Sequence, residues 1–133
     1  MTDFVTDTHA LIWYLEDSSR LGVAARSAFN ACDKGAADIY IPTICLVEII
    51  YLQEKGRIPA DLLLQLEDEL QAGNTGLIIA DLTNEIAKTV KHIPRTAVPD
   101  MPDRIIVATA LHLGFSLLSR DRKIQLASVD TIW

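Results

Sequence analysis

The feature that most constrains the fold is an alternation of short, continuously apolar segments with longer segments of helical periodicity. The expected strands are Phe4–Thr6, Ile39–Ile41, "GLIIA", "FSLLS" and "DTIW". The expected helices lie at roughly 8–16, from a possible cap at Ser19 to Gly35, in "TICLVEIIYLQEKG", from Pro59 to Gly73, and in "NEIAKTVKHIP" and "DRIIVATALHLG". Apolar strands separated by helices are typical of a parallel sheet covered on both faces. We therefore predict an α/β fold, a three-layer α/β/α sandwich with a mostly parallel central sheet.

Length and charge narrow the class of protein further. The 133 residues are expected to form one domain, 1–133, with a net charge of −6. That charge argues against coating nucleic acid by long-range attraction, but a nuclease remains possible because a cation-binding acidic cluster is itself negative. No apolar stretch approaches the roughly 20 residues that span a bilayer, and the start lacks a signal peptide, so we expect no membrane contact and a cytoplasmic location. Cys32 and Cys45 are expected to be reduced core thiols.

Acidic residues fall where such a sheet would form a site. Asp7 follows the first expected strand and Asp121 follows the fourth, while Glu48 lies one turn into the helix after the second strand. Asp103 opens the helix before the fourth strand. The carboxyl ends of parallel strands meet at one edge, where ligands bind. Each aspartate also has a simpler explanation, since Asp7 could cap its helix, Asp103 could form a capping arrangement with Asp100, and Asp121 could begin a turn.

Glu48 is the hardest of these acids to explain structurally. It interrupts the apolar run "ICLVEIIYL", where a charge is costly without compensation. No lysine or arginine lies at a helical partner spacing, so a tertiary partner or a bound cation is required. Converging carboxylates repel one another and take up protons unless a cation binds. Ligands that are all oxygen suit Mg²⁺ or Mn²⁺, whereas the scattered histidines do not favour a zinc site.

The acidic segments resemble a known family. Asp7 in "TDTHALIWYL", Glu48 in "LVEI", Asp103 in "PDMPDRIIVATAL" and Asp121 in "LLSRD" are similar to the four acidic positions of PIN domains, most closely those of VapC-like toxins of type II toxin–antitoxin modules. The likeness covers essentially the whole chain. It implies a metal-dependent endoribonuclease in which a metal-activated water hydrolyses RNA phosphodiesters. It also implies a homodimer and a small antitoxin whose C-terminal segment wraps the toxin.

The resemblance assigns the main roles as follows. Asp7, Asp103 and Asp121 would bind Mg²⁺ or Mn²⁺ directly. Glu48 would either ligate the metal or orient the attacking water. No acid of the set is missing, which argues against an inactive relative.

Four further residues receive supporting roles. Ser119 occupies a position where relatives often have a small hydroxyl residue near the metal waters. Asp100 is expected to cap the helix that Asp103 opens, although relatives often carry an acid there too. Arg104 and Arg120 sit beside ligand acids and could contact RNA phosphate, although a solvated arginine is the simpler explanation for each.

Two other functions are compatible with parts of the pattern. A catalytically inactive PIN-like interaction module would keep the acids only as caps and turn residues, and Mn²⁺ would then leave the melting temperature unchanged. A phosphatase using Asp7 as nucleophile would need a second aspartate two positions on, where His9 stands. The Ile- and Leu-rich helices 44–55 and 60–72 could offer a partner an apolar groove, although core packing would also explain their composition.

Overall fold

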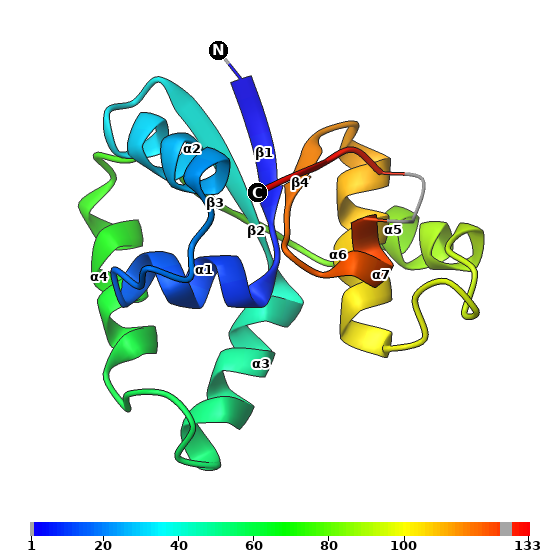
Figure 1. The fold of residues 1–133 in the computed structure, drawn as a ribbon, viewed down its shortest axis with the longest axis horizontal. Coiled ribbons are helices and arrows are strands. Elements are labelled where there is room, and N and C mark those ends of the chain that lie inside the picture. The colour runs from blue at the N-terminus through cyan, green and yellow to red at the C-terminus, as the bar shows by residue number, and fades with distance from the viewer. Residues whose placement is uncertain (1, 126–128) are drawn as a thin grey trace.

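A computed structural model describes residues 2–125 and 129–133 (Figure 1). Five parallel strands form one sheet in the order β3-β2-β1-β4-β5. The strands are β1 (Thr2–Thr6), β2 (Ala37–Pro42), β3 (Leu77–Ala80), β4 (Ser116–Leu118) and β5 (Thr131–Ile132). The helices are α1 (Thr8–Leu15), α2 (Val23–Asp33), α3 (Thr43–Glu54), α4 (Leu62–Ala72), α5 (Asn84–Thr89), the 3-10 turn η1 (Val90–His92), α6 (Met101–Leu113) and α7 (Arg122–Gln125). The predicted α/β/α sandwich with a parallel sheet is confirmed.

The central strand β1 is buried between helices. In Figure 1, α1, α2 and α4 lie to one side of the strands and α5, α6 and α7 to the other. Val5 of β1 pairs with Tyr40 of β2 and with Leu117 of β4, and both Val5 and Leu117 are fully buried. Strands covered on both faces carry apolar residues at successive positions, which explains the continuous runs in the sequence.

The predicted start of the second helix is wrong. We expected Ser19 to cap it, but α2 begins at Val23 with Gly22 as its N-cap. The Ser18 hydroxyl accepts a hydrogen bond from the Arg20 amide at 3.1 Å, so this stretch forms a turn instead. Gly22 packs so closely on Trp133 that an added Cβ would lie 2.6 Å from the Trp133 backbone. The residue at the start of α2 therefore lies against a residue far away in the sequence.

Smaller differences occur at other helix ends. The fourth helix begins at Leu62 rather than Pro59, because Pro59 lies in a turn closed by the Leu62 amide. The segment after Asp121, expected as a turn, forms the short helix α7. Cys32 and Cys45 are buried free thiols, as predicted. Within the described residues, no helix is long and apolar enough to cross a membrane.

The sheet brings the ends of β1 and β4 together. The two strands pair in parallel, and the Asp7 amide continues the ladder by donating to the Leu118 carbonyl at 3.1 Å. Asp7 and the segment that begins at Ser119 therefore leave the sheet side by side. Both segments turn outward at the carboxyl edge of the sheet, which is the edge predicted to carry the site.

Candidate active site

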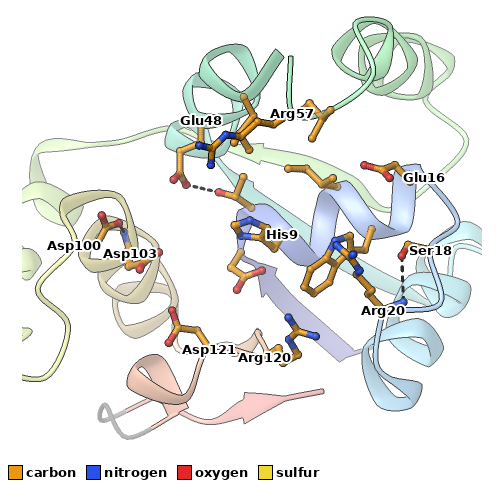
Figure 2. A pocket seen from close by; sticks show the side chains of 16 residues that line it. His9, Glu16, Ser18, Arg20, Glu48, Arg57, Asp100, Asp103, Arg120 and Asp121 are labelled. Atoms are coloured by element: carbon orange, nitrogen blue, oxygen red, sulfur yellow. Dashed lines mark hydrogen bonds between the residues drawn. The ribbon is translucent and has the colours of Figure 1, made fainter. Parts of the chain in front are cut away.

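A cleft of about 1040 Å³ opens at this carboxyl edge (Figure 2). Six carboxylates line it: Asp7, Glu16, Glu48, Asp100, Asp103 and Asp121. The structure thus gathers all four acids that the sequence singled out, together with Asp100, although they belong to four separate segments. Figure 2 shows Glu48, Asp100, Asp103 and Asp121 around one side of the cleft.

Asp7 is the most buried of the six acids that line the cleft. Its carboxylate accepts a hydrogen bond from the Ala10 amide at 2.8 Å, so it caps α1, and it is only 8% exposed. Burial raises the pKa of Asp7, while hydrogen bonds from Ser119 and the Ala10 amide oppose that rise. Capping uses one carboxylate oxygen, so the simple explanation and the functional one are compatible.

Ser119 connects two of the acids from behind the cleft. It is fully buried, and its hydroxyl oxygen accepts a hydrogen bond from the Asp121 amide at 3.1 Å. The same hydroxyl hydrogen-bonds to the Asp7 carboxylate. Asp121 in turn accepts from the Lys123 amide at 2.8 Å, at the start of α7. Ser119 therefore orients Asp7 relative to Asp121 and does not itself line the cleft.

Thr8 is the partner that Glu48 required. The Thr8 hydroxyl, at the start of α1, donates to the Glu48 carboxylate of α3. Burial raises the pKa of Glu48, and the Thr8 hydrogen bond opposes that rise. Sequence reasoning missed Thr8, although a hydroxyl next to Asp7 at the expected edge was a visible signal.

Asp100 and Asp103 have different roles at the start of α6. Asp100 caps the helix by accepting from the Asp103 amide at 3.2 Å, as predicted. Asp103 lies in the first turn, where its pKa is raised to about 7, first by burial and then by the neighbouring charges of Asp100, Asp121, Glu48 and Asp7 in that order. The carboxylates are thus close enough to repel one another.

Arg104 and Arg120, the two residues predicted to contact phosphate, lie in different surroundings. Arg104 points away from the cleft, and its guanidinium donates to the Ile93 carbonyl at 2.8 and 3.1 Å and to the Val90 carbonyl at 3.0 Å. Its expected role is therefore corrected: these bonds fix the chain before α6, and the side chain does not line the cleft. Arg120 does line the cleft, with its guanidinium carbon 4.7 Å from the centroid of Trp13.

Several lining residues carried no recognisable signal in the sequence. Arg20 and Arg57 come from the loops that follow α1 and α3, and their approach depends on how those helices pack. His9 is exposed on α1, with its ring centroid 5.6 Å from that of Trp13. An aromatic residue on a helix, such as Trp13, is expected from sequence to be a core residue, and the Trp13 side chain is only 8% exposed.

The chemistry of the donor set suits a hard divalent cation. The acids offer oxygen only, and their mutual repulsion would be relieved by a cation. In the part of the chain that the structure describes, no group of three or more Asp, Glu, His or Cys side chains is placed so that it could hold a metal ion. Mg²⁺ is usually held by one or two carboxylates with waters and substrate phosphates, so a group of three protein ligands is not required.

An all-parallel α/β sandwich with an acidic cleft at the carboxyl edge has its candidate site where open sheets of this class bind ligands. The PIN domain family model matches residues 4–130, and the chain belongs to this family. Ribonuclease VapC22 of Mycobacterium tuberculosis is 28% identical over 125 residues, covering 94% of this chain and 92% of the relative.

Solved structures share the fold. A DNA-bound VapBC from Salmonella typhimurium aligns with a TM-score of 0.73 at 20% identity, over 99% of this chain and 98% of that one. VapBC2 from Rickettsia felis, bound to a promoter DNA fragment, aligns with a TM-score of 0.72 at 15% identity, over 98% of both chains.

Proposed function

We propose that residues 1–133 act as a single-domain endoribonuclease, the toxin of a type II toxin–antitoxin module, which hydrolyses RNA phosphodiesters with Mg²⁺ or Mn²⁺. The observation that carries the proposal is the convergence of Asp7, Glu48, Asp103 and Asp121 on one cleft from four segments. Caps and turns alone would not require these acids to face the same space. The similarity to a relative named as a ribonuclease supports the reaction class.

The chain's own residues would prepare the site for substrate. Asp7, Asp103 and Asp121 would hold the cation, and Glu48 would ligate it or orient the attacking water. A bound Mg²⁺ or Mn²⁺ supplies a lowered water pKa and neutralises charge on the phosphodiester. Thr8 fixes the Glu48 carboxylate, and hydrogen bonding to such outer partners maintains ligand geometry.

Purified protein tests the proposal directly. RNA cleavage should require Mg²⁺ or Mn²⁺ and stop with a chelator. Asp7→Asn and Asp103→Asn should abolish cleavage and any growth inhibition, while Asp68→Asn, an exposed acid of α4 outside the cleft, should leave both unchanged. Full cleavage by either cleft variant, with its folding confirmed by circular dichroism, would refute the assignment of these residues to the active site.

The partner proposal rests on a separate surface. Val47, Ile50 and Tyr51 of α3 and Leu64 of α4 are large apolar side chains left exposed, with Tyr51 60% exposed. We propose that an antitoxin segment docks on these helices in the cytoplasm and that the toxin is a homodimer. Two of the structural neighbours are described as VapBC assemblies, which supports an antitoxin.

Co-expression with a small neighbouring gene tests this partner. Tyr51→Ser should weaken the complex without reducing RNA cleavage by the free chain, since Tyr51 does not line the cleft. Light scattering of the free chain reports the dimer. If Mn²⁺ neither supports cleavage nor raises the melting temperature, the inactive interaction module becomes the better description.

A further inference from the structure

Basic side chains line the cleft as well as acidic ones. Three of the chain's seven arginines line it, Arg20, Arg57 and Arg120, and no lysine does. They come from three loops: the one after α1, the one after α3 and the one after β4. Figure 2 draws Arg57 beside Glu48, Arg120 below His9, and Arg20 across His9 from Asp103. The chain as a whole has a net charge of −6, so these three arginines concentrate positive charge at one place in an acidic protein.

None of these arginines is paired with an acid. Within residues 2–125 and 129–133, the one ion pair joins Arg26 to Asp17 at 3.1 Å, away from the cleft. Arginine beside a carboxylate readily forms a two-pronged pair, yet all three remain exposed among six carboxylates. Their guanidinium donors are therefore free for a ligand, and their planar fork matches a phosphate.

Arg120 is oriented by the aromatic residues beneath it. Its guanidinium stacks on Trp13, whose ring also contacts His9 and, edge-on at 5.7 Å, Trp133. Because these neighbours leave Trp13 only 8% exposed, the ring cannot serve as a platform for a base. It supports Arg120 instead, through a cation–π contact that leaves the N–H groups at the guanidinium edge able to donate.

We propose that Arg20, Arg57 and Arg120 bind the RNA phosphates that flank the one entering the carboxylate cluster, so the cleft holds a bent, single-stranded segment. This inference rests on the proposed nuclease function. The cleft volume of about 1040 Å³ lies at the upper end of the roughly 300–1000 Å³ typical of small-ligand pockets. Asp7 in its lining is only 8% exposed, so a strand must bend to reach it, which single strands permit and stiff duplexes resist.

Binding measured apart from cleavage tests the arginines. In the Asp103→Asn background, fluorescence anisotropy would follow a labelled single-stranded RNA of mixed sequence over a range of salt concentrations. Arg20→Gln, Arg57→Gln and Arg120→Gln should each raise Kd by roughly three- to tenfold. Each should also reduce the slope of log K against log salt by about 0.7, the value expected for one lost contact to a single strand.

Two variants control the measurement. Arg95→Gln removes the same charge from an exposed site outside the cleft and should change neither Kd nor slope. Arg57→Lys keeps the charge and should retain the slope. In the active chain, the three glutamine variants should raise KM by a larger factor than they lower kcat, as expected for lost substrate binding.

The outcomes separate this inference from the nuclease proposal. If the three glutamine variants match Arg95→Gln, or if they impair only antitoxin binding, the arginine site is refuted while nuclease activity can stand. If the native chain cleaves no RNA but the slopes fall as expected, the binding site stands and the nuclease proposal fails. RNA binding too weak to measure would refute the inference.

Discussion

Replacing Asp103 by asparagine should stabilise the metal-free protein while abolishing its response to metal. Burial and the neighbouring acids raise the pKa of Asp103 from 3.8 to about 7. The unfolded chain therefore ionises at this position before the folded chain does. Between about pH 4 and pH 7 the folded state binds more protons, so stability contributed by this group is present at low pH and is lost as pH rises to about 7.

The size of the effect follows from the shift. The full difference of about three pKa units corresponds to roughly 4 kcal/mol, but Asp103 is only half-buried, so solvent screening reduces it to about 1–2 kcal/mol. Asparagine is nearly isosteric and uncharged, and the Asp103 carboxylate accepts no hydrogen bond identified among the described residues. The variant should thus gain about 1–2 kcal/mol at pH 8.

Urea unfolding in the presence of a chelator, at pH 5 and pH 8, measures this gain in the stability of Asp103→Asn. The native midpoint should fall between the two conditions, while that of the variant should fall less and exceed the native value at pH 8 by roughly 0.5–1 M. Saturating Mn²⁺ should then reverse the order by raising the native midpoint alone. A variant less stable than the native chain at pH 8 without metal would refute the repulsion argument, and Asp68→Asn serves as the control.

Three further predictions concern residues around the site. Thr8→Val should leave Glu48 without its hydrogen bond and lower apparent Mn²⁺ affinity by roughly tenfold, measured by thermal shift, and an unchanged affinity would contradict its role. Arg104→Ala should cost about 2 kcal/mol in urea unfolding by freeing two backbone carbonyls, yet leave KM unchanged for folded protein. Gly22→Ala should lower stability by about 1–3 kcal/mol through its clash with Trp133, and less in a Trp133→Ala background, whereas additive losses would exclude that contact.

The sequence predicted the sheet well because burial dictated its pattern. Continuous apolar runs such as Leu117–Leu118, in which both side chains are fully buried, fit between two layers of helices, and this requirement is local to each run. Helix ends were less predictable where tertiary contacts decide them. The second helix begins at Val23, and its N-cap Gly22 lies against Trp133, a residue far away in the sequence.

The acidic half of the site was predictable, and the basic half was not. A charge such as Glu48 in an apolar run signals a partner from sequence alone. Exposed arginines such as Arg20 and Arg57 carry no such signal, because they are ordinary loop residues until the loops are placed in space. Arg104 was misassigned for the same reason, since its backbone acceptors depend on how the preceding segment folds back.

The strand order has a consequence for how the protein is made. Strand β1 leaves the ribosome first, but one of its two partners, β4, is synthesised after every other strand except β5. A nascent chain that stops before Ser119 lacks both Asp121 and the hydroxyl that orients Asp7. The cleft therefore cannot assemble before β4 and the segment that follows it have been synthesised, and a product interrupted earlier lacks one side of the cleft.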